Sequence, residues 1–408
     1  MVPVPLLAFA VLAARRPASL FQADFWAEDG WRWYPDAYND GWRTLFSPYA
    51  GYLQSICRLV GLAAQPFPLA WAPTIFALSA LVIQLGAAML LVSSRLDHVW
   101  PHRASRVLFA LIYLLLPNSF EVYANLTNAQ WHLSLIAFLL LAARPARTAG
   151  GRLADLMLIA LSGSSGPFSL FLLPVSIWQS WRKRDSDSTW KLAVILVCSI
   201  VQACVAVGAG RGAAPLLGAG PRRLATIVAL QIIAGTELGR HVMPRLIPMS
   251  AWQDGVIPIL VTGIAGSLAI VALRSGGTML RQFALYAALV GVAGLLRPAT
   301  GSATPAWQLF AMPDIGDRYY LIPMLAWIGV LFTLTGASRT SVRRTAYFLI
   351  ALVLLAIPGD LHFATRLATS PPTGFAARAR SFASGPPGLR MQFPLRPEGV
   401  PPMSLTRR

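Results

Sequence analysis

Long apolar stretches separated by shorter polar segments make up most of this 408-residue chain. Several of the stretches are shorter than the roughly 20 residues that a helix needs to cross a bilayer upright. We therefore expect some helices to extend into flanking polar residues and others to stop partway through the membrane. The eleven predicted spans are 2–14, 71–94, 106–118, 131–143, 153–163, 167–181, 191–209, 256–273, 281–297, 319–336 and 345–358.

The composition supports a membrane protein and excludes several other classes. Hydrophobic residues make up 56% of the chain and charged residues only 12%, against roughly 25% charged residues in a soluble domain. The net charge of +18 comes from scattered residues, and no nucleic-acid-binding module is present, so we expect no nucleic-acid partner. The predicted fold class is all-α, a polytopic helical membrane protein with about 11 transmembrane helices and further helices on its outer face.

The positive charges of the short loops predict the orientation of these spans. Five loops rich in arginine and lysine fall on one side of the membrane if all eleven stretches cross it, and that side is the cytoplasm. Only four of the 16 acidic residues, Asp97, Asp155, Asp185 and Asp187, lie in these loops or within three residues of them. The basic loops are 95–106, 144–152, 182–191, 274–281 and 339–344.

The longer segments fall on the outer side. Residues 51–68 have apolar positions at helical spacing and predict a helix on the membrane surface. The segment SGSSGP at 162–167 predicts a tight hairpin between two spans. The predicted division is a transmembrane domain over 1–358, with a first outer loop at 15–70 and an outer loop with an interfacial or re-entrant helix at 211–255, followed by a Pro/Gly/Arg-rich outer tail over 359–408 without helical periodicity, held only near MQFPLRPEGVPPMSL.

The first outer loop carries the most informative cluster of side chains. Nearly a third of the chain's acidic residues, Asp24, Glu28, Asp29, Asp36 and Asp40, fall within 17 residues and alternate with tryptophan and tyrosine. Aromatic rings stack on sugar faces, and a carboxylate with a raised pKa accepts a hydroxyl proton as a general base. Asp29, Glu28 and Asp24 are therefore candidate catalytic residues. The alternative is a solvated loop in which these acids pair with nearby arginines.

The second candidate is the outer entrance to a span, ANLTNAQWHL at 124–133. Asn128, Gln130, Trp131 and His132 offer hydrogen-bond donors and acceptors around one indole ring, which suits sugar hydroxyls or a lipid phosphate. The alternative is helix capping combined with an aromatic residue of the membrane interface.

The third candidate is the segment PDIGDRYYLIPM at 313–324. Arg318 stands one residue before a span, and an arginine can hold a phosphate through two parallel hydrogen bonds. Further outer arginines that we expect at the same anion site are Arg58, Arg240, Arg245 and Arg297, and His241 and Glu237 are weaker candidates. The alternative for Arg318 is an interfacial arginine paired with Asp317.

These motifs together resemble the GT-C glycosyltransferases. The stretches AEDGWRWYPDAYNDGWRTLFSPYAGYLQSICRL, TNAQWHL, SGSSGPFSLFLLP, DRYYLIP and PLRPEG…MSL are similar to a bacterial group of uncharacterised multi-spanning proteins of that type. The resemblance implies a GT-C-like transmembrane domain in the bacterial inner membrane. It also implies transfer of a sugar from a polyprenyl-phosphate donor to an acceptor at the periplasmic face. Glu28 and Asp29 would occupy the base positions, and Arg318, followed by Tyr319, the phosphate contact.

The resulting hypothesis is an inverting glycosyltransferase that takes a polyprenyl-phosphate-linked sugar and a glycan or lipid acceptor, within membrane lipid. No ligand set requires a metal, although a divalent ion, Mg or Mn, would be able to bridge an acid and the phosphate. The alternative is a non-catalytic translocase of lipid-linked sugars or a subunit for assembly and export of envelope polysaccharide. The expected site residues are Asp29, Glu28 and Asp24 for catalysis, Arg318, Arg58, Tyr319 and Arg297 for the donor phosphate, and Trp31, Trp33, Tyr52, Asn128, Gln130, Trp131 and His132 for sugar and acceptor.

Overall fold

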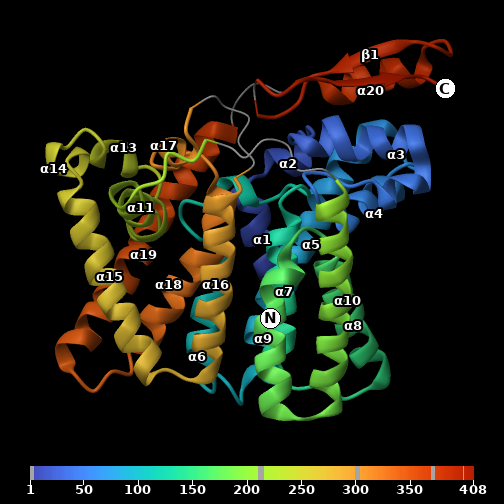
Figure 1. Ribbon diagram of the computed structural model, residues 1–408. Coiled ribbons are helices and arrows are strands. Elements are labelled where there is room, and N and C mark those ends of the chain that lie inside the picture. The colour runs from blue at the N-terminus through green and yellow to red at the C-terminus, as the bar shows by residue number, and fades with distance from the viewer. Residues whose placement is uncertain (1–3, 210–215, 299–303, 369–372, 398) are drawn as a thin grey trace.

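A computed structural model of the chain describes residues 4–209, 216–298, 304–368, 373–397 and 399–408, with only the helical backbone for 362–368. Each of the eleven predicted apolar stretches contains one long helix in these residues, and most of the helices run roughly parallel to one another (Figure 1). These helices are α1 Val4–Arg15, α5 Ala72–Val92, α6 Arg103–Leu114, α7 Ala129–Ala142, α8 Ala149–Gly163, α9 Phe168–Lys183, α10 Ser186–Gly208, α15 Val256–Ser275, α16 Thr278–Leu296, α18 Leu321–Leu334 and α19 Thr340–Ala368.

Length and composition identify fewer than eleven candidate membrane spans. Within the described residues, five helices are both long and apolar enough to span a bilayer, which makes the chain a multi-pass membrane protein. Helices α1 and α7 are apolar but shorter. The total of eleven spans therefore stays a prediction. The five candidates are Leu69–Val92, Ser186–Gly208, Val256–Ser275, Thr278–Leu296 and Thr340–Leu361.

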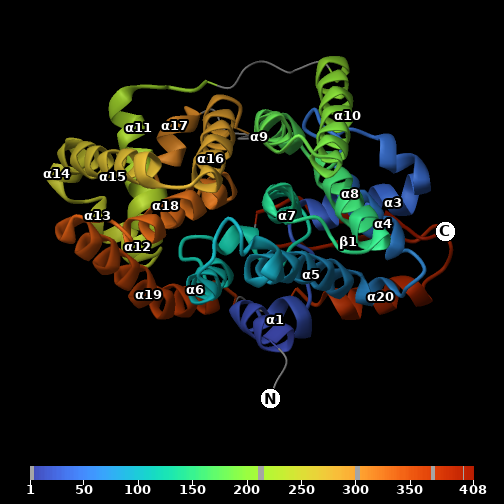
Figure 2. The same cartoon turned by 90° about the horizontal axis from the view of Figure 1, so that it is seen from below.

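Helix α7 lies at the centre of the part of the molecule that carries the site. Its sequence is apolar on every side, and every residue from Ala129 to Ala142 except Gln130 is buried. Such a helix is stable only when neighbouring helices enclose it, and α5, α8 and α9 pack against it (Figure 2). The one partly exposed residue, Gln130, lies in the first turn, where α7 meets the outer segments.

The connections separate into two ends of the molecule, as the loop charges predict. The five basic loops join long helices at one end, at the bottom of Figure 1. Contacts tie these loops together: Arg95 forms an ion pair with Asp155 at 2.5 Å, and the Lys183 ammonium donates to the carbonyl of Leu141 at 3.0 Å. The short helices and the long connections gather at the opposite end. The cytoplasmic location of the basic end stays a prediction.

Short helices build that opposite end. The segment 51–68, predicted to be helical, contains helix α4. The segment 162–167 is a tight turn between α8 and α9, as predicted. The short helices are α2 Ala18–Phe21, η1 Asp29–Trp33, α3 Tyr34–Asp40, η2 Gly41–Phe46, α4 Ser55–Ala63, η3 Leu69–Trp71, η5 Phe120–Val122, α13 Met243–Leu246, α14 Ser250–Gln253, α17 Ala306–Phe310 and η7 Asp317–Tyr320, with η4 Ser94–Leu96 at the basic end.

The predicted helix of the 211–255 segment is present and lies across the long helices. It runs without interruption through α11 Pro221–Ile227, the π-helical turn η6 Val228–Ala234 and α12 Gly235–Leu238. Figures 1 and 2 show it nearly perpendicular to α15 and α16. It packs against α15, α18 and α19. Gln231 fastens it by donating to the carbonyls of Phe310 and Met312 at 2.9 and 2.6 Å.

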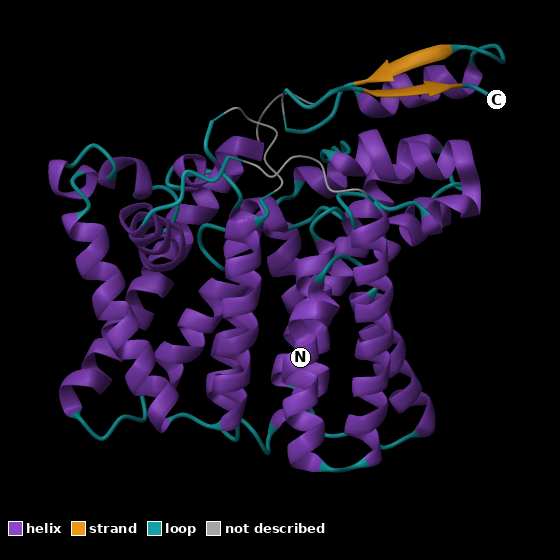
Figure 3. Cartoon of the chain, viewed as in Figure 1, coloured by secondary structure: helices purple, strands orange, loops and turns teal. Residues whose placement is uncertain are grey.

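The tail differs from the prediction and corrects the all-α assignment. It contains helix α20 Phe375–Ser384 and an antiparallel pair of strands, β1 Arg390–Phe393 and β2 Met403–Thr406, in which Phe393 lies opposite Met403 (Figure 3). The inward residues of the strands alternate with exposed ones, and Phe393 packs against two phenylalanines of α20. Four-residue strands between prolines and glycines carry too little periodicity to predict.

Candidate functional site

A cavity of about 1510 Å³ lies at the end of the molecule where the outer segments meet. Three groups of side chains line it. The first comes from the first outer loop, and the second from the starts of α7 and α9 together with the end of α16 and η7. The third comes from the tail, through Arg396, Pro397 and Val400. Eleven of the fourteen predicted site residues line this cavity: Asp24, Glu28, Asp29, Trp33, Tyr52, Asn128, Gln130, Trp131, Arg297, Arg318 and Tyr319.

One side of the cavity is apolar. Leu170 and Phe171 of α9 and Val290, Ala293 and Leu296 of α16 line it there. The two helices pack against each other as neighbours in the bundle. Val292 and Leu296 of α16 expose 54% and 53% of their surface, so the helix face beside the cavity is available to lipid. The cavity therefore joins a polar chamber to an apolar flank.

Glu28 and Asp29 are adjacent in the sequence but differ in their contacts. Glu28 is partly exposed on the cavity wall and accepts one hydrogen bond, from the Tyr49 hydroxyl at 3.3 Å. In the part of the chain that the structure describes, no arginine or lysine forms an ion pair with Glu28. One carboxylate oxygen is thus left to meet a substrate hydroxyl.

Asp29, at the start of the π-helical turn η1, is only 2% exposed. Its two oxygens accept three hydrogen bonds, from the Leu126 amide at 3.0 Å and from the Thr127 amide and hydroxyl at 2.8 Å each. Burial raises the pKa of Asp29 to about 7, and the three hydrogen bonds act in the opposite direction. Asp29 joins η1 to the loop that precedes α7. Its three hydrogen bonds occupy the acceptor positions that a general base needs to receive a proton.

Asp24 contacts the tail. Its carboxylate accepts hydrogen bonds from the amide and hydroxyl of Thr373 at 3.2 and 2.6 Å and forms an ion pair with Arg396 at 3.4 Å. The backbone of Arg396 also pairs with Phe25 and Ala27. The predicted catalytic role of Asp24 is therefore replaced, on geometry, by attachment of the tail to the first outer loop. This attachment brings the tail onto the cavity.

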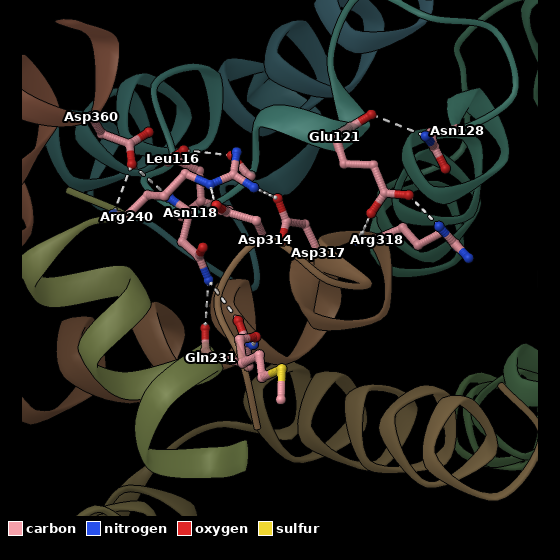
Figure 4. A network of polar contacts seen from close by, with 12 residues as sticks. Leu116, Asn118, Glu121, Asn128, Gln231, Arg240, Asp314, Asp317, Arg318 and Asp360 are labelled. Carbon is pink, nitrogen blue, oxygen red and sulfur yellow. Dashed lines mark hydrogen bonds and ion pairs between the residues drawn. The ribbon is translucent and has the colours of Figure 1, made fainter. Parts of the chain in front are cut away.

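Arg318 lies in η7, directly before α18, and a carboxylate from another segment holds its side chain. Its guanidinium and its backbone amide both contact Glu121 of η5, the amide at 3.2 Å (Figure 4). Glu121 raises the pKa of Arg318 against the effect of burial, so the charge is fixed. The guanidinium carbon lies 4.9 Å from the centre of the Tyr319 ring. An anion entering the cavity would meet an oriented arginine.

A second ion cluster fixes the segment that carries Arg318. Arg240, in the loop after α12, contacts Asp314 and forms an ion pair with Asp317 at 3.2 Å (Figure 4). Its backbone amide donates to Asp360 of α19 at 3.0 Å, as does the amide of Asn118 at 3.1 Å. Asp317 is fully buried in this cluster, and burial raises its pKa. The network joins four outer segments beneath the cavity.

The start of α7 presents two buried polar atoms that have no partner among the described residues. The Trp131 side chain is 7% exposed and its indole Nε1 has no hydrogen-bond partner. The Gln130 Oε1 atom beside it is also buried and unpartnered, while Nε2 donates to the Thr127 carbonyl at 3.4 Å. Both residues line the cavity. The unmet donor and the unmet acceptor are buried atoms of two residues of the cavity wall, and their hydrogen-bonding capacity matches that of the hydroxyl groups on a sugar ring.

Two glycines allow this arrangement. Gly166 has a φ of +88°, and a Cβ at this position would lie 2.3 Å from the Gln130 Oε1 atom. A Cβ at Gly294 of α16 would lie 2.8 Å from the Tyr319 ring. Tyr319 in turn packs edge-to-face on Trp131 with ring centres 5.7 Å apart. Side chains at these two positions would therefore displace Gln130 and Tyr319.

Three predicted site residues do not line the cavity. Arg58 is fully buried within the first outer loop, where it pairs with Asp36 and donates to the Ser47 carbonyl at 3.3 Å. His132 is fully buried between the Tyr113 hydroxyl at 2.7 Å and the Val122 carbonyl at 2.9 Å. Trp31 packs on Tyr49. Their predicted substrate contacts are corrected to packing roles. Neighbouring segments use the polar groups of Arg58 and His132, and the Trp31 ring packs on Tyr49 outside the lining of the cavity.

Trp33, Tyr52 and Asn128 line the cavity in different ways. The Trp33 indole is nearly buried and donates to the Thr127 hydroxyl at 2.9 Å. Asn128 donates to the Glu121 carbonyl at 3.0 Å and so supports the residue that holds Arg318. Tyr52 is partly exposed on the wall.

Sequence reasoning did not identify three charged residues of the wall, Glu121, Arg16 and Arg396. Glu121 was the only acid in a short loop between two apolar stretches, and that isolation was an available signal. Arg16 and Arg396 stand in an arginine-rich context in which single positions are not distinguishable. No group of three or more His, Cys, Asp or Glu side chains in the described ranges is arranged to hold a metal ion.

Comparisons with known proteins give one weak structural similarity. No protein-family model matches the chain, and no curated protein matches it. Among solved structures, the fold is similar to arabinosyltransferase EmbB from Mycobacterium smegmatis, at 14% sequence identity and a TM-score of 0.39. The similarity covers 94% of this chain and 43% of that chain, so this chain spans less than half the length of the enzyme it matches.

Proposed function

We propose that this protein is an inverting membrane glycosyltransferase that transfers a sugar from a polyprenyl-phosphate donor to an acceptor at the periplasmic face. The observation that carries the proposal is the composition of one cavity. A partly exposed carboxylate, Glu28, an oriented arginine, Arg318, and the unpartnered polar atoms of Gln130 and Trp131 all line it. An apolar flank between α9 and α16 completes it and offers a place for a prenyl chain.

The donor phosphate is assigned to Arg318, with Tyr319 and Arg297 beside it. Arg297 ends α16, is exposed, and lines the cavity near the apolar flank. A phosphate in this position has an arginine on the polar side and the α9 and α16 side chains on the other, which fits a lipid-linked phosphate. The sugar would then lie against Gln130 and Trp131.

The chemistry is a single displacement. The acceptor hydroxyl oxygen attacks the anomeric carbon, the bond from that carbon to the phosphate oxygen breaks, and the hydroxyl proton moves to the Glu28 carboxylate. The electron pair of the broken bond stays on the departing phosphate, whose negative charge Arg318 stabilises. Attack opposite the leaving group inverts the anomeric centre. Glu28 is favoured over Asp29 as the base because three hydrogen bonds occupy the Asp29 oxygens.

The test is release of lipid phosphate from a labelled polyprenyl-phosphate sugar by the purified full-length protein. Loss of a general base lowers the rate by about 10²–10⁴-fold, so Glu28→Gln is expected to lower the transfer rate about 1000-fold without changing the melting temperature. Asp40→Asn is the matched control, because Asp40 is an exposed acid of the same outer loop outside the cavity.

Two results would contradict the proposal. Equal transfer rates for Glu28→Gln and the wild type would exclude Glu28 as the base. Movement of the lipid-linked sugar across a vesicle membrane without any release of lipid phosphate would instead identify a non-catalytic translocase. Cysteine labelling at Asp40 from the outside of intact cells checks the periplasmic location, and labelling only after lysis would overturn it.

A further inference from the structure

Five arginines line the cavity, and their ion pairs distinguish them. Arg240 pairs with Asp314 and Asp317, Arg318 pairs with Glu121, and Arg396 pairs with Asp24. Arg16 and Arg297 form no ion pair with a carboxylate among the residues that the structure describes. Arg297 is exposed, whereas Arg16 is partly buried. Arg16 is therefore the cavity arginine with the least compensated charge in an enclosed position.

The surroundings of Arg16 hold its guanidinium in place. The guanidinium carbon lies 3.9 Å from the centre of the Trp26 ring and 5.0 Å from that of Phe120. One nitrogen, Nη1, donates to the Tyr123 carbonyl at 3.3 Å. A guanidinium carries five N–H donors in a fixed plane, so most of the Arg16 donors have no acceptor in the part of the chain that the structure describes. Contacts with aromatic rings fix the plane of an arginine without neutralising it.

Neighbouring charges compensate the Arg16 charge only in part. Burial lowers the pKa of Arg16 to about 10, Asp29 opposes this effect, and the charge of Arg396 adds to it. The Asp29 oxygens accept hydrogen bonds from Leu126 and Thr127. The Arg16 position is thus a fixed, partly desolvated cation that a bound anion would stabilise.

Arg16 and Arg318 belong to different walls. Arg318 contacts the Tyr319 ring, and Tyr319 packs on Trp131. These residues line the same cavity as the apolar flank between α9 and α16. Arg16 follows α1 and lies near Ser19 and Gln22 of the segment containing α2 and near the tail residue Arg396, a polar wall. Two neighbouring residues of η5 contact the two arginines: the Phe120 ring contacts the Arg16 guanidinium, and Glu121 forms an ion pair with Arg318.

We infer that Arg16 binds an oxyanion, a carboxylate or phosphate, carried by the acceptor. This inference rests on the proposed function, because the wall of Arg318 is there assigned to the lipid-linked donor. The acceptor class would then be an anionic glycan, such as one containing an acidic or phosphorylated sugar, with its anion at Arg16 and its reacting hydroxyl near Glu28.

The experiment measures binding to the purified full-length protein by isothermal titration calorimetry, without any transfer reaction. The probes are D-glucuronate, D-glucose as its neutral counterpart, inorganic phosphate, and farnesyl phosphate as a lipid-linked anion. Arg16→Gln is expected to weaken binding of glucuronate and inorganic phosphate about tenfold, the size expected for loss of a charged hydrogen bond, and to leave farnesyl phosphate binding unchanged. Arg378→Gln, at an exposed arginine of α20 outside the cavity, is the control for loss of one positive charge.

Each other outcome overturns the inference. Unchanged glucuronate binding in Arg16→Gln would show that Arg16 binds no acceptor anion. Dependence on Arg16 only for farnesyl phosphate would assign the anion to the donor. If Arg16→Gln does not fold, phenylglyoxal modification of the wild type, located by mass spectrometry, replaces it. Protection of Arg16 by glucuronate but not by glucose supports the inference, and equal modification overturns it. Transfer activity is not involved, so failure of the proposed function would be recognised separately.

Discussion

Arg318 on the cavity wall and Arg58 inside the first outer loop have similar surroundings in the sequence but different positions in the structure. Both are outer arginines held by a carboxylate, Glu121 and Asp36 respectively. Arg318 lies on the cavity wall. Arg58, in α4, is fully buried and contacts Asp36 and the Trp33 ring. An arginine held by a carboxylate thus lines the cavity in one region and packs inside the loop in the other. Access to the cavity decides between them, and residue type does not.

Two pairs of adjacent residues repeat this contrast. Trp131, a residue of the cavity wall, has a buried indole N–H without a partner among the described residues, whereas both ring nitrogens of His132 contact protein groups. Glu28 has one hydrogen bond and Asp29 has three. A polar group whose hydrogen bonds are complete stabilises the fold, and a polar group with unmet capacity at a cavity is available to a ligand.

Between Arg318 and Arg58, the larger expected effect is on Arg318. Arg318→Gln is expected to lower kcat for sugar transfer by about 100-fold, because removing one group that stabilises transition-state charge costs about 10²–10³ in rate. The melting temperature should fall only slightly, since the Arg318 side chain is 28% exposed. A rate within threefold of the wild type would remove Arg318 from the mechanism.

Arg58→Gln is expected to affect stability rather than chemistry. Loss of the buried guanidinium removes a partner of Asp36, although Arg32 stays 3.0 Å from that carboxylate. We expect a loss of about 2 kcal/mol in the free energy of unfolding, below the range for a fully isolated buried charge, measured by denaturant titration in detergent. The transfer rate of the folded fraction should stay near the wild-type value, and a selective loss of rate would restore Arg58 to the site.

Trp131→Phe tests the unpartnered indole. The substitution keeps an aromatic ring and removes the N–H donor, so the KM for the lipid-linked donor is expected to rise about fivefold, the effect of one neutral hydrogen bond of about 1 kcal/mol. Trp181→Phe is the control, because Trp181 is 69% exposed near the far end of α9. Equal KM values in the two variants would argue against a sugar contact by Trp131.

Asp29→Asn tests the pH dependence of stability. A carboxyl group whose folded-state pKa is about 7 binds more protons folded than unfolded between about pH 4, its usual pKa, and pH 7. The wild type is therefore expected to lose stability relative to Asp29→Asn as the pH rises through this window and to lose no more above it. Melting curves at pH 5, 6, 7 and 8 check this, and a constant difference between the two proteins would contradict it.

The sequence was sufficient for the helices because their signal is local. Each predicted apolar stretch contains a helix, and the basic loops gather at one end. The sequence did not predict the helix and strands of the tail. The tail is stabilised by contacts of its strands with α20 and by contacts with the first outer loop, such as the backbone pairing of Arg396 with Phe25. The contacts with the first outer loop join residues more than 350 positions apart, and no local pattern represents them.

Composition and periodicity by themselves determined that this chain is helical and membrane-embedded, and they identified an acidic and aromatic outer loop. They also selected Glu28, Arg318 and Trp131 as candidates. Only the tertiary structure decided which candidates share a cavity, that Arg58 and His132 do not, and that Asp24 binds the tail. It also supplied Glu121 and Arg16. The physical reason is that hydrophobic patterning acts along one segment, whereas exposure to a cavity and completion of hydrogen bonds depend on which distant segments meet.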